Sequence, residues 1–302
     1  MSMNAARTLE DLGEDRLVAL LTGTWAKTLK KGMLGVGDDC AVLPPLSGKN
    51  TRTLFKTDAV VEGVHFTRKD PPRLVGWKAL ARCVSDMAAM GGEPVSALIT
   101  LGAPPSESVS RLSGIYRGIK KAADAFGIAL VGGETTRCRE LFISVALTGK
   151  VEAKNLVLRS GASFGDAIFV TGTLGGTLRG KHLRFTPRLD EARWLVHHCK
   201  PSAMMDVSDG LAKDLPRLCR VSGVGFYLDG NAVPVSRCCS IEQALCDGED
   251  FELLFTVSEK KVSALVRCWP FKTRLSKIGR ITVAGQGKPM SNQHGFDHFK
   301  RA

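Results

Sequence analysis

The sequence predicts an α/β protein built from two domains, and three observations lead to this prediction. A chain of 302 residues is long for a single hydrophobic core. Segments typical of strands alternate with segments typical of helices. A stretch rich in glycine and polar residues, 152–166, separates two such regions. We therefore expect an N-terminal domain at residues 1–149 and a C-terminal α/β domain at residues 150–302.

The elements of the first domain follow from local patterns. Residues 9–21 have the spacing of an amphipathic helix, and residues 51–66 are rich in β-branched residues, as strands are. The segment 71–92 begins with two prolines and stops at two glycines, which are the usual start and stop signals of a helix. The alternation then continues with a strand at 95–104, a helix at 110–127, a strand at 128–137 that runs into a glycine turn, and a strand at 141–151. A strand beginning at residue 167 opens the second domain.

The composition indicates a folded cytoplasmic protein. Hydrophobic residues make up 44% of the chain and charged residues 24%, and no apolar run is long enough to cross a membrane. The acidic residues Glu10, Asp11, Glu14 and Asp15 occupy the region where a signal peptide needs basic and apolar residues. The nine cysteines include no Cys-x-x-Cys pair, so we expect free thiols rather than a zinc cluster or a disulfide framework.

The net charge of +12 raises the question of an anionic partner. The basic residues are scattered, only 6% of the residues are aromatic, and no nucleic-acid-binding module is recognisable. We therefore expect no nucleic-acid partner. A solvated basic surface explains the charge, and attraction of anionic small molecules is the second interpretation.

Carboxylates stand beside apolar runs at several places, where burial is costly unless a cation or hydrogen bonds satisfy them. On the expected helix at 71–92, Asp86 shares one stripe with Ala79, Cys83 and Met90, so it is expected to face inward. An exposed pair with Arg82, four residues earlier, is the alternative, and the helix alone does not decide between the two.

Other acids recur next to glycines and at strand ends. A single acid can be explained by local structure alone. Asp39 would fit a polar turn, and Ser208 or Asp209 would fit the cap of a helix. The acids concerned are Asp38, Asp39, Asp58, Glu134, Asp206, Asp209, Glu249, Asp250 and Glu252. Their recurrence favours a hard cation such as Mg²⁺, which takes oxygen ligands from carboxylates and phosphates. The residues by themselves therefore indicate a Mg²⁺-dependent enzyme for a phosphorylated ligand.

One motif is a false lead. The segment 175–182, GGTLRGKH, is close to a phosphate-binding P-loop, but His182 replaces the Ser or Thr that would contact Mg²⁺. Pro187 would also cut short the helix that should follow, so we interpret the match as chance.

Seven stretches follow one another along the chain: GVGDDCAVL, KTDAVVEGVHF, WKALARCVSDMAAMGGEP, LVGGETTR, LRSGASFGDAIFVTG, MDVSDGLAKDL and GEDFELLFTV. Taken in this order, they resemble the thiamine-monophosphate kinase family, within the aminoimidazole-ribotide-synthetase-like superfamily of ATP-binding proteins. The resemblance spans nearly the whole chain. It implies a two-domain fold in which the N-terminal domain forms a β-barrel across a homodimer and the C-terminal α/β domain closes over the site.

The resemblance also implies roles for single residues. The implied Mg²⁺ ligands are Asp39, Thr57, Asp58, Asp86, Glu134, Asp206 and Asp209. The implied ATP contacts are Tyr116, Gly133, Glu134, Arg159 and Ser208. The implied thiamine-phosphate contacts are His65, Glu249 and Phe296. ATP as co-substrate and several Mg²⁺ ions complete this expectation.

Two positions depart from the family pattern. Lys56 stands where the family usually has Ser or Thr, and Glu134 stands where the family usually has Asp. The lysine could displace one metal ion, or its ammonium could replace part of that ion's charge. The segment 173–206 is also shorter than in the family.

The expected reaction is direct in-line transfer of the γ-phosphoryl of ATP to thiamine phosphate, between phosphates bridged by Mg²⁺. The acceptor phosphate has a second pKa near ~6 and is largely ionised at neutral pH, so no general base is expected. Two alternatives remain: another ATP-dependent enzyme of the superfamily, such as aminoimidazole ribotide synthetase, or a non-catalytic nucleotide-binding sensor.

Overall fold

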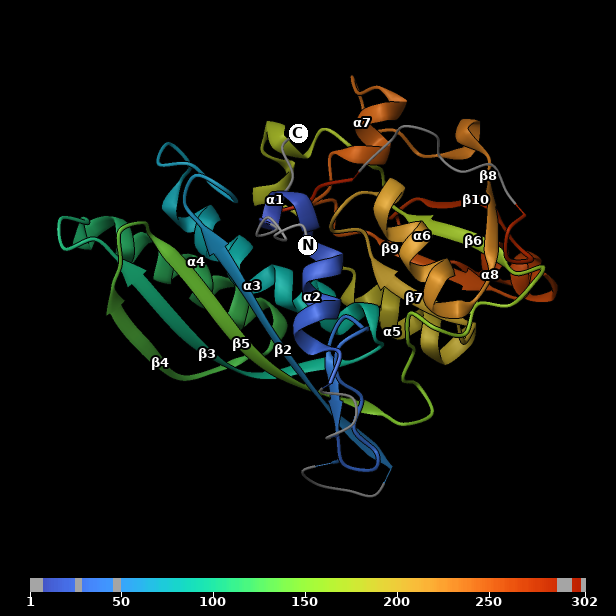
Figure 1. The fold of residues 1–302 in the computed structure, drawn as a ribbon, viewed down its shortest axis with the longest axis horizontal. Coiled ribbons are helices and arrows are strands. Elements are labelled where there is room, and N and C mark those ends of the chain that lie inside the picture. The colour runs from blue at the N-terminus through green and yellow to red at the C-terminus, as the bar shows by residue number, and fades with distance from the viewer. Residues whose placement is uncertain (1–7, 25–28, 46–49, 287–294, 300–302) are drawn as a thin grey trace, which may run out of the picture.

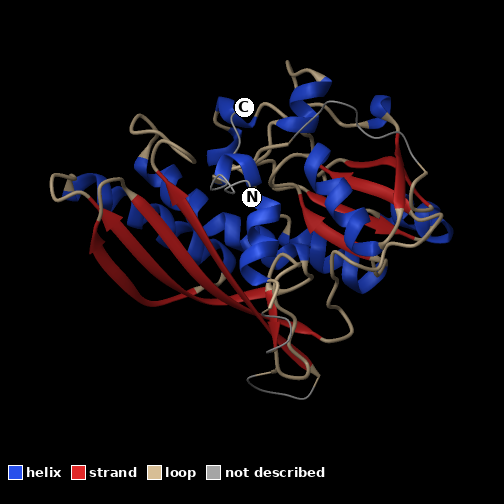
Figure 2. Ribbon diagram, viewed as in Figure 1, coloured by secondary structure: helices blue, strands red, loops and turns tan. Residues whose placement is uncertain are grey.

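The computed structural model describes residues 8–24, 29–45, 50–286 and 295–299, and these form two sheets with helices packed between and around them (Figures 1 and 2). The first sheet has the strand order β1-β2-β5-β3-β4 and the second the order β7-β9-β6-β10-β8. The first sheet consists of β1 (Ala41–Leu43), β2 (Thr51–Val61), β3 (Glu93–Ala103), β4 (Ala129–Arg137) and β5 (Phe142–Glu152). The second consists of β6 (Ala167–Thr171), β7 (Ala203–Asp206), β8 (Gly225–Leu228), β9 (Leu253–Val257) and β10 (Leu275–Thr282).

The helices and short 3₁₀ segments connect these strands. They are α1 (Leu9–Leu12), α2 (Glu14–Thr22), α3 (Pro72–Ala89), α4 (Val109–Phe126), η2 (Thr177–Arg179), η3 (Lys181–Leu183), α5 (Leu189–His198), α6 (Leu211–Ser222), η4 (Gly230–Ala232), α7 (Ile241–Cys246) and α8 (Glu259–Cys268). The expected alternation of strands and helices is therefore present. Because β5 runs to Glu152, the first sheet reaches slightly past the expected boundary at residue 150, which stays a prediction.

Two local expectations are wrong in detail. The helix expected at 9–21 is broken at Gly13, whose φ of 73° is a conformation that favours glycine. The strand β4 does not end in a glycine turn but continues through Gly132 and Gly133. A Cβ atom at Gly133 would lie 1.9 Å from the Ile99 carbonyl oxygen, so the missing side chain is what lets β4 approach β3.

The P-loop-like segment does not have the fold of a P-loop. It folds as η2 and η3 instead of opening a helix after the strand, and Lys181 donates hydrogen bonds to the Thr173 carbonyl oxygen and to Asp250. The interpretation of this motif as a chance match is therefore confirmed. All nine cysteines are free thiols, which was also expected. Within the described residues, no helix has both the length and the apolar character needed to cross a bilayer.

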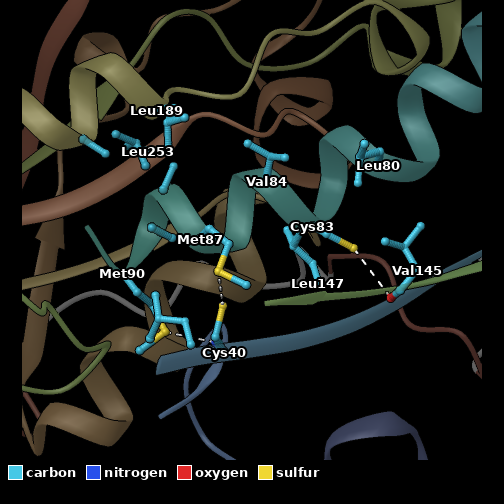
Figure 3. Packing of buried hydrophobic residues seen from close by; sticks show 14 of the residues in the cluster. Cys40, Leu80, Cys83, Val84, Met87, Met90, Val145, Leu147, Leu189 and Leu253 are labelled. Atoms are coloured by element: carbon cyan, nitrogen blue, oxygen red, sulfur yellow. Dashed lines mark hydrogen bonds between the residues drawn. The ribbon is translucent and has the colours of Figure 1, made fainter. Parts of the chain in front are cut away.

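Helix α3 is the central element of the molecule. On one side its residues Leu80, Cys83 and Met87 pack toward Val145 and Leu147 of β5, and other residues of the same helix reach Leu189 and Leu253 of the C-terminal domain (Figure 3). Thirteen of its 18 residues are buried. One hydrophobic cluster thus includes residues of both sheets, and α3 holds the two domains together.

Of the elements that the structure describes, helices α3 and α4 cover one face of the first sheet, and the other face is left open (Figure 2). Successive residues of a strand point to opposite faces, so the register separates the two sets. Lys56 and Asp58 lie opposite the buried residues Leu147 and Val145, on the helix-covered face. Phe55 and Thr57 therefore lie on the open face.

The close approach of α3 and α4 depends on glycines. A Cβ at Gly76 would lie 1.9 Å from the Ile115 carbonyl oxygen, and one at Gly118 would lie 2.0 Å from the Arg73 carbonyl oxygen. In an open helix, Gly→Ala would stabilise by about 1 kcal/mol. Here Gly76→Ala is expected to lower the free energy of unfolding by about 1–3 kcal/mol, because the two helix backbones must move apart.

Urea and thermal unfolding measure this change, with Gly230→Ala as the matched control, since nothing lies within 4 Å of a Cβ there. Equal melting temperatures for Gly76→Ala and Gly230→Ala would contradict the packing described.

Candidate active site

Three carboxylates from both domains meet at one point. Asp39 lies just before β1, Asp86 lies on α3, and Asp206 ends β7. Each offers an oxygen within 4.8 Å of the others, and all three residues are buried. We call these three residues the acid cluster. The inward orientation expected for Asp86 is therefore confirmed.

Local structure explains why these side chains converge. Ser85 and Asp86 lie in the last turns of α3, where the helix passes the end of β7. The Ser85 hydroxyl donates a 2.6 Å hydrogen bond to Asp206 Oδ2. Since β7 belongs to the second sheet, this bond joins the two domains at the cluster itself.

Side-chain cations surround the acids. Arg159, in the segment between the two sheets, binds Asp39 through both carboxylate oxygens, at 2.8 and 3.2 Å. Lys56 of β2 donates a 2.8 Å hydrogen bond to Asp86 Oδ1. Arg82 Nε lies 3.2 Å from Asp58 Oδ2. The alternative pairing of Arg82 with Asp86 is therefore not formed, because Arg82 reaches Asp58 and Asp86 is held by Lys56.

One oxygen of the acid cluster has no hydrogen-bond partner among the described residues. It is Oδ1 of Asp206, a residue that is only 2% exposed. Burial and the nearby charge of Asp39 raise the pKa of Asp206 to about 6, and burial raises the pKa of Asp86 despite the attraction of Lys56. A buried oxygen that lacks a cation, in a donor set made only of oxygens, is what a hard divalent ion binds. The residues present therefore fit Mg²⁺.

Asp58, Thr57 and Glu134 are not members of the acid cluster, although the charge of Asp58 lies close enough to help raise the pKa of Asp86. Asp58 is on the same sheet face as Lys56. Thr57 and Glu134 lie on the open face, since Glu134 is in register with Thr100, which pairs with Ser144 of β5. Their roles as ligands stay predictions.

Asp209 is engaged by two cations of α6. Lys213 and Arg217 lie 3.1 and 3.0 Å from its Oδ2. Neither Ser208 nor Asp209 caps this helix, which corrects that alternative. The backbone N–H groups of both residues instead donate to the buried Asp214 carboxylate, a contact that follows from the turn and was not visible in the sequence. The role of Asp209 as a metal ligand also stays a prediction.

The expected ATP contacts are spread along the first sheet and the domain boundary. Tyr116 on α4 is 39% exposed, and Gly133 and Glu134 are exposed on β4. Ser208 follows the end of β7, two residues after Asp206. Among these expected ATP contacts, Arg159 alone has a described contact with the acid cluster, through Asp39. The nucleotide roles stay predictions.

A second buried cluster lies two turns earlier on the same face of α3. The Lys78 ammonium, which is fully buried, contacts Glu249, His182 Nδ1 and the His65 carbonyl oxygen. We call Lys78, His182 and Glu249 the Lys78 cluster. Burial would raise the pKa of Glu249, but His182, Lys78 and Arg82 outweigh it and lower the pKa to about 2. Glu249 is therefore an anion held in place by buried partners.

His65 and Phe296, two of the expected substrate contacts, are linked through His298. The ring centroids of His65 and His298 are 5.3 Å apart, and those of Phe296 and His298 are 4.8 Å apart. The Val61 N–H donates to His65 Nδ1, so a neutral His65 carries its proton on Nε2. Its Nε2–H is then a donor, and the ring is poorly suited to accept a proton. The substrate roles of His65, Glu249 and Phe296 stay predictions.

Sequence reasoning missed Lys78 and gave Arg82 only a surface role. The signal was present: Lys78, Arg82 and Asp86 are spaced i, i+4 and i+8, and the remaining residues of the helix from 79 to 89 are small or apolar. A charged stripe on an otherwise buried helix indicates charges that are paired inside the protein.

His65 generates a pH prediction. Burial and the charge of Arg82 lower its pKa from 6.5 to about 4. As pH falls from about 6.5 to about 4, the unfolded chain takes up this proton before the folded chain does, so the free energy of unfolding falls across that window and not above it. We expect His65→Gln to reduce this loss, by at most about 3 kcal/mol.

Urea unfolding at several pH values tests this, with the exposed His197→Gln as control. A pH dependence of His65→Gln that matches the control would show that His65 titrates normally in the folded chain.

The chain is similar to proteins of a known family. Models of the AIR synthase related protein match it twice, the N-terminal domain at residues 37–151 and the C-terminal domain at residues 162–290. The thiamine-monophosphate kinase of Rhodopirellula baltica is 36% identical, over 89% of this chain and 89% of its own length. That of Aquifex aeolicus is 34% identical, over 96% of this chain and 99% of its own length.

Among solved structures, AaThiL complexed with AMPPCP and TMP superposes with a TM-score of 0.85 at 32% identity, over 98% of this chain and 100% of that one. The two-domain α+β architecture of the relatives is thus the architecture found here. The identities and the coverage together show that this chain belongs to the thiamine-monophosphate kinase family.

Proposed function

We propose that this chain transfers the γ-phosphoryl group of ATP to thiamine phosphate. The observation that carries the proposal is the acid cluster, in which three buried carboxylates from both domains converge and one oxygen has no partner among the residues placed in the structure. The kinase relatives and the solved complex with AMPPCP and TMP support the choice of nucleotide and acceptor.

The proposed step exchanges one phosphoanhydride bond for another. An ionised oxygen of the thiamine phosphate forms a bond to the γ-phosphorus, and the bond from that phosphorus to the β,γ-bridging oxygen breaks. The bonding electrons leave with ADP, and thiamine diphosphate is the second product. Since the acceptor oxygen is ionised near neutral pH, no side chain has to remove a proton. A neutral His65 agrees with this assignment.

Charge is the obstacle that the site must overcome. Unit charges of like sign ~4 Å apart repel by about 4 kcal/mol at an effective dielectric constant of 20. Bound Mg²⁺ would supply the opposing charge between the phosphates. Asp39, Asp86 and Asp206 would hold it, with Asp58, Thr57, Glu134 and Asp209 as further proposed ligands. Arg159 and Lys56 add fixed positive charge beside the same carboxylates.

The substrate would lie along α3. Lys78 and Asp86 are eight residues apart, which is about 12 Å along a helix axis. The acid cluster at one end would receive the phosphates, and the Lys78 cluster at the other end would face the organic part of thiamine phosphate. Glu249, His65 and Phe296 are the proposed contacts there. Tyr116, Gly133, Glu134, Arg159 and Ser208 are the proposed contacts of ATP.

We further propose that two copies of the chain pair through the open face of the first sheet to form a β-barrel. This face and its edge strand expose apolar side chains that no described element covers. They include Phe55, Val95, Leu98 and Val131, each more than 40% exposed. Such a patch is typical of a protein–protein contact. A cytoplasmic location likewise stays a prediction.

Activity is the first test of this function. The chain should convert ATP and thiamine phosphate to ADP and thiamine diphosphate, and excess EDTA should abolish turnover. Mass spectrometry of the products measures this turnover.

The acid cluster generates a separate prediction. Asp206→Asn should lower kcat at least about 100-fold, because it removes a carboxylate from the cluster, and steady-state kinetics measure the change.

The control is Asp124→Asn, whose carboxylate pairs with Lys120 on the surface and should leave kcat unchanged. Nucleotide binding without a diphosphate product would favour a sensor. Turnover of an aminoimidazole-pathway substrate in place of thiamine phosphate would favour another enzyme of the superfamily.

The proposed dimer has a separate test. Leu98→Lys places a charge on the open face of the sheet and should convert a dimer to a monomer, as light scattering during gel filtration would show. Val266→Lys, at an exposed position of α8, is the matched control and should leave the assembly unchanged. A wild-type chain that is monomeric at high concentration would rule out this pairing.

A further inference from the structure

A lysine side chain enters the acid cluster from the first sheet. Lys56 Nζ lies 2.8 Å from Asp86 Oδ1, and its side chain is only 22% exposed. Lys56 lies on the helix-covered face of β2, so the strand backbone directs its side chain toward α3. The ammonium is therefore built into the site by the sheet.

The other acids near this point have different partners. Asp39 is bound by Arg159, and Asp58 by Arg82. In the part of the chain that the structure describes, Asp206 accepts a hydrogen bond only from the Ser85 hydroxyl, on Oδ2, and its buried Oδ1 has no partner. The contacts thus distinguish two sides of the cluster. Asp86 already holds a protein cation, whereas Asp206 has an oxygen free for a metal ion.

The balance of charges points the same way. When all four are ionised, the carboxylates of Asp39, Asp58, Asp86 and Asp206 face three side-chain cations within the described residues, which leaves one surplus negative charge. Without the Lys56 ammonium the surplus would be two, which is the charge of one divalent ion. Lys56 therefore carries part of the positive charge that metal ions would otherwise have to provide.

We propose that the Lys56 ammonium is a resident cation of the site, which takes the place of one divalent ion at Asp86 and stays there when nucleotide binds. This inference deepens the proposed function and rests on it, because the same acid cluster would hold the metal ions. It assigns Lys56 a positioning role, in which the ammonium keeps Asp86 fixed and limits how many divalent ions the site takes up.

Metal stoichiometry tests the inference without turnover. Mn²⁺ is titrated into the chain with a non-hydrolysable ATP analogue and thiamine phosphate, and free Mn²⁺ is followed by electron paramagnetic resonance. Lys56→Thr, which removes the charge and opens space beside Asp86, should bind one more Mn²⁺ per chain than the wild type. Lys56→Arg, which keeps a positive charge, should bind the wild-type number.

Lys277→Thr is the matched control, because Lys277 also lies on a strand and pairs with a carboxylate, at 2.7 Å from Glu259, far from the cluster in sequence. It should bind the wild-type number of Mn²⁺ ions. An unchanged stoichiometry for folded Lys56→Thr overturns the inference.

The unaltered chain provides a second measurement, which does not depend on the folding of a variant. Anomalous scattering from Mn²⁺ in crystals with the same analogue locates the ions. Lys56 should remain hydrogen-bonded to Asp86 Oδ1, and Mn²⁺ should lie on the Asp206 side. A Mn²⁺ ion bound to Asp86 Oδ1, with Lys56 turned away, overturns the inference.

The two proposals can fail separately. If the stoichiometry follows Lys56 but thiamine phosphate is not turned over, the proposed function fails and the resident cation stands. If turnover is found but Lys56→Thr gains no ion, only the resident cation fails.

Discussion

The burial of α3 between the two sheets is the constraint on which the rest of the structure depends. Where α3 is covered on both sides its charged side chains cannot reach water, yet this part of the helix carries Lys78, Arg82 and Asp86 along one stripe. Each of these charges must find a partner inside the protein, since an unpaired buried charge costs several kcal/mol. The partners come from β2 and from the C-terminal domain. Pairing the charges of one helix therefore fixes how the two domains meet.

This arrangement keeps the carboxylates in place at a cost in stability. Asp86 and Asp206 are buried near one another, and burial raises the pKa of each. Lys56 and Arg159 offset part of the repulsion, and the Ser85 hydroxyl satisfies one oxygen of Asp206. What remains is Asp206 Oδ1, which has no partner within the described ranges of the chain, and a divalent ion would relieve this local instability. Residual strain of this kind is common where a protein is organised for a ligand.

The two clusters on α3 also explain why the site needs both domains. Glu249 reaches Lys78 from the loop before β9, in a left-handed conformation with a φ of 54°, and Asp206 reaches Ser85 from the end of β7. Neither contact exists within one domain. A shift of the C-terminal domain would separate both pairs at once, so the position of this domain controls the phosphate end and the organic end of the proposed substrate site together.

The sequence by itself determined the local elements and the chemistry of the site. Prolines and glycines set the ends of α3, β-branched runs set β2 and β5, and the recurrence of acids next to glycines indicated a cation site, because these signals depend on residues close in the chain. The tertiary structure decided which acids meet. Asp39, Asp86 and Asp206 converge while Thr57 and Glu134 lie on the other sheet face, since strand parity and the docking of α3 set those positions. Only the tertiary structure decided that Asp86 pairs with Lys56 and Arg82 with Asp58, because ion pairs between distant segments form only once the sheet and helix are packed.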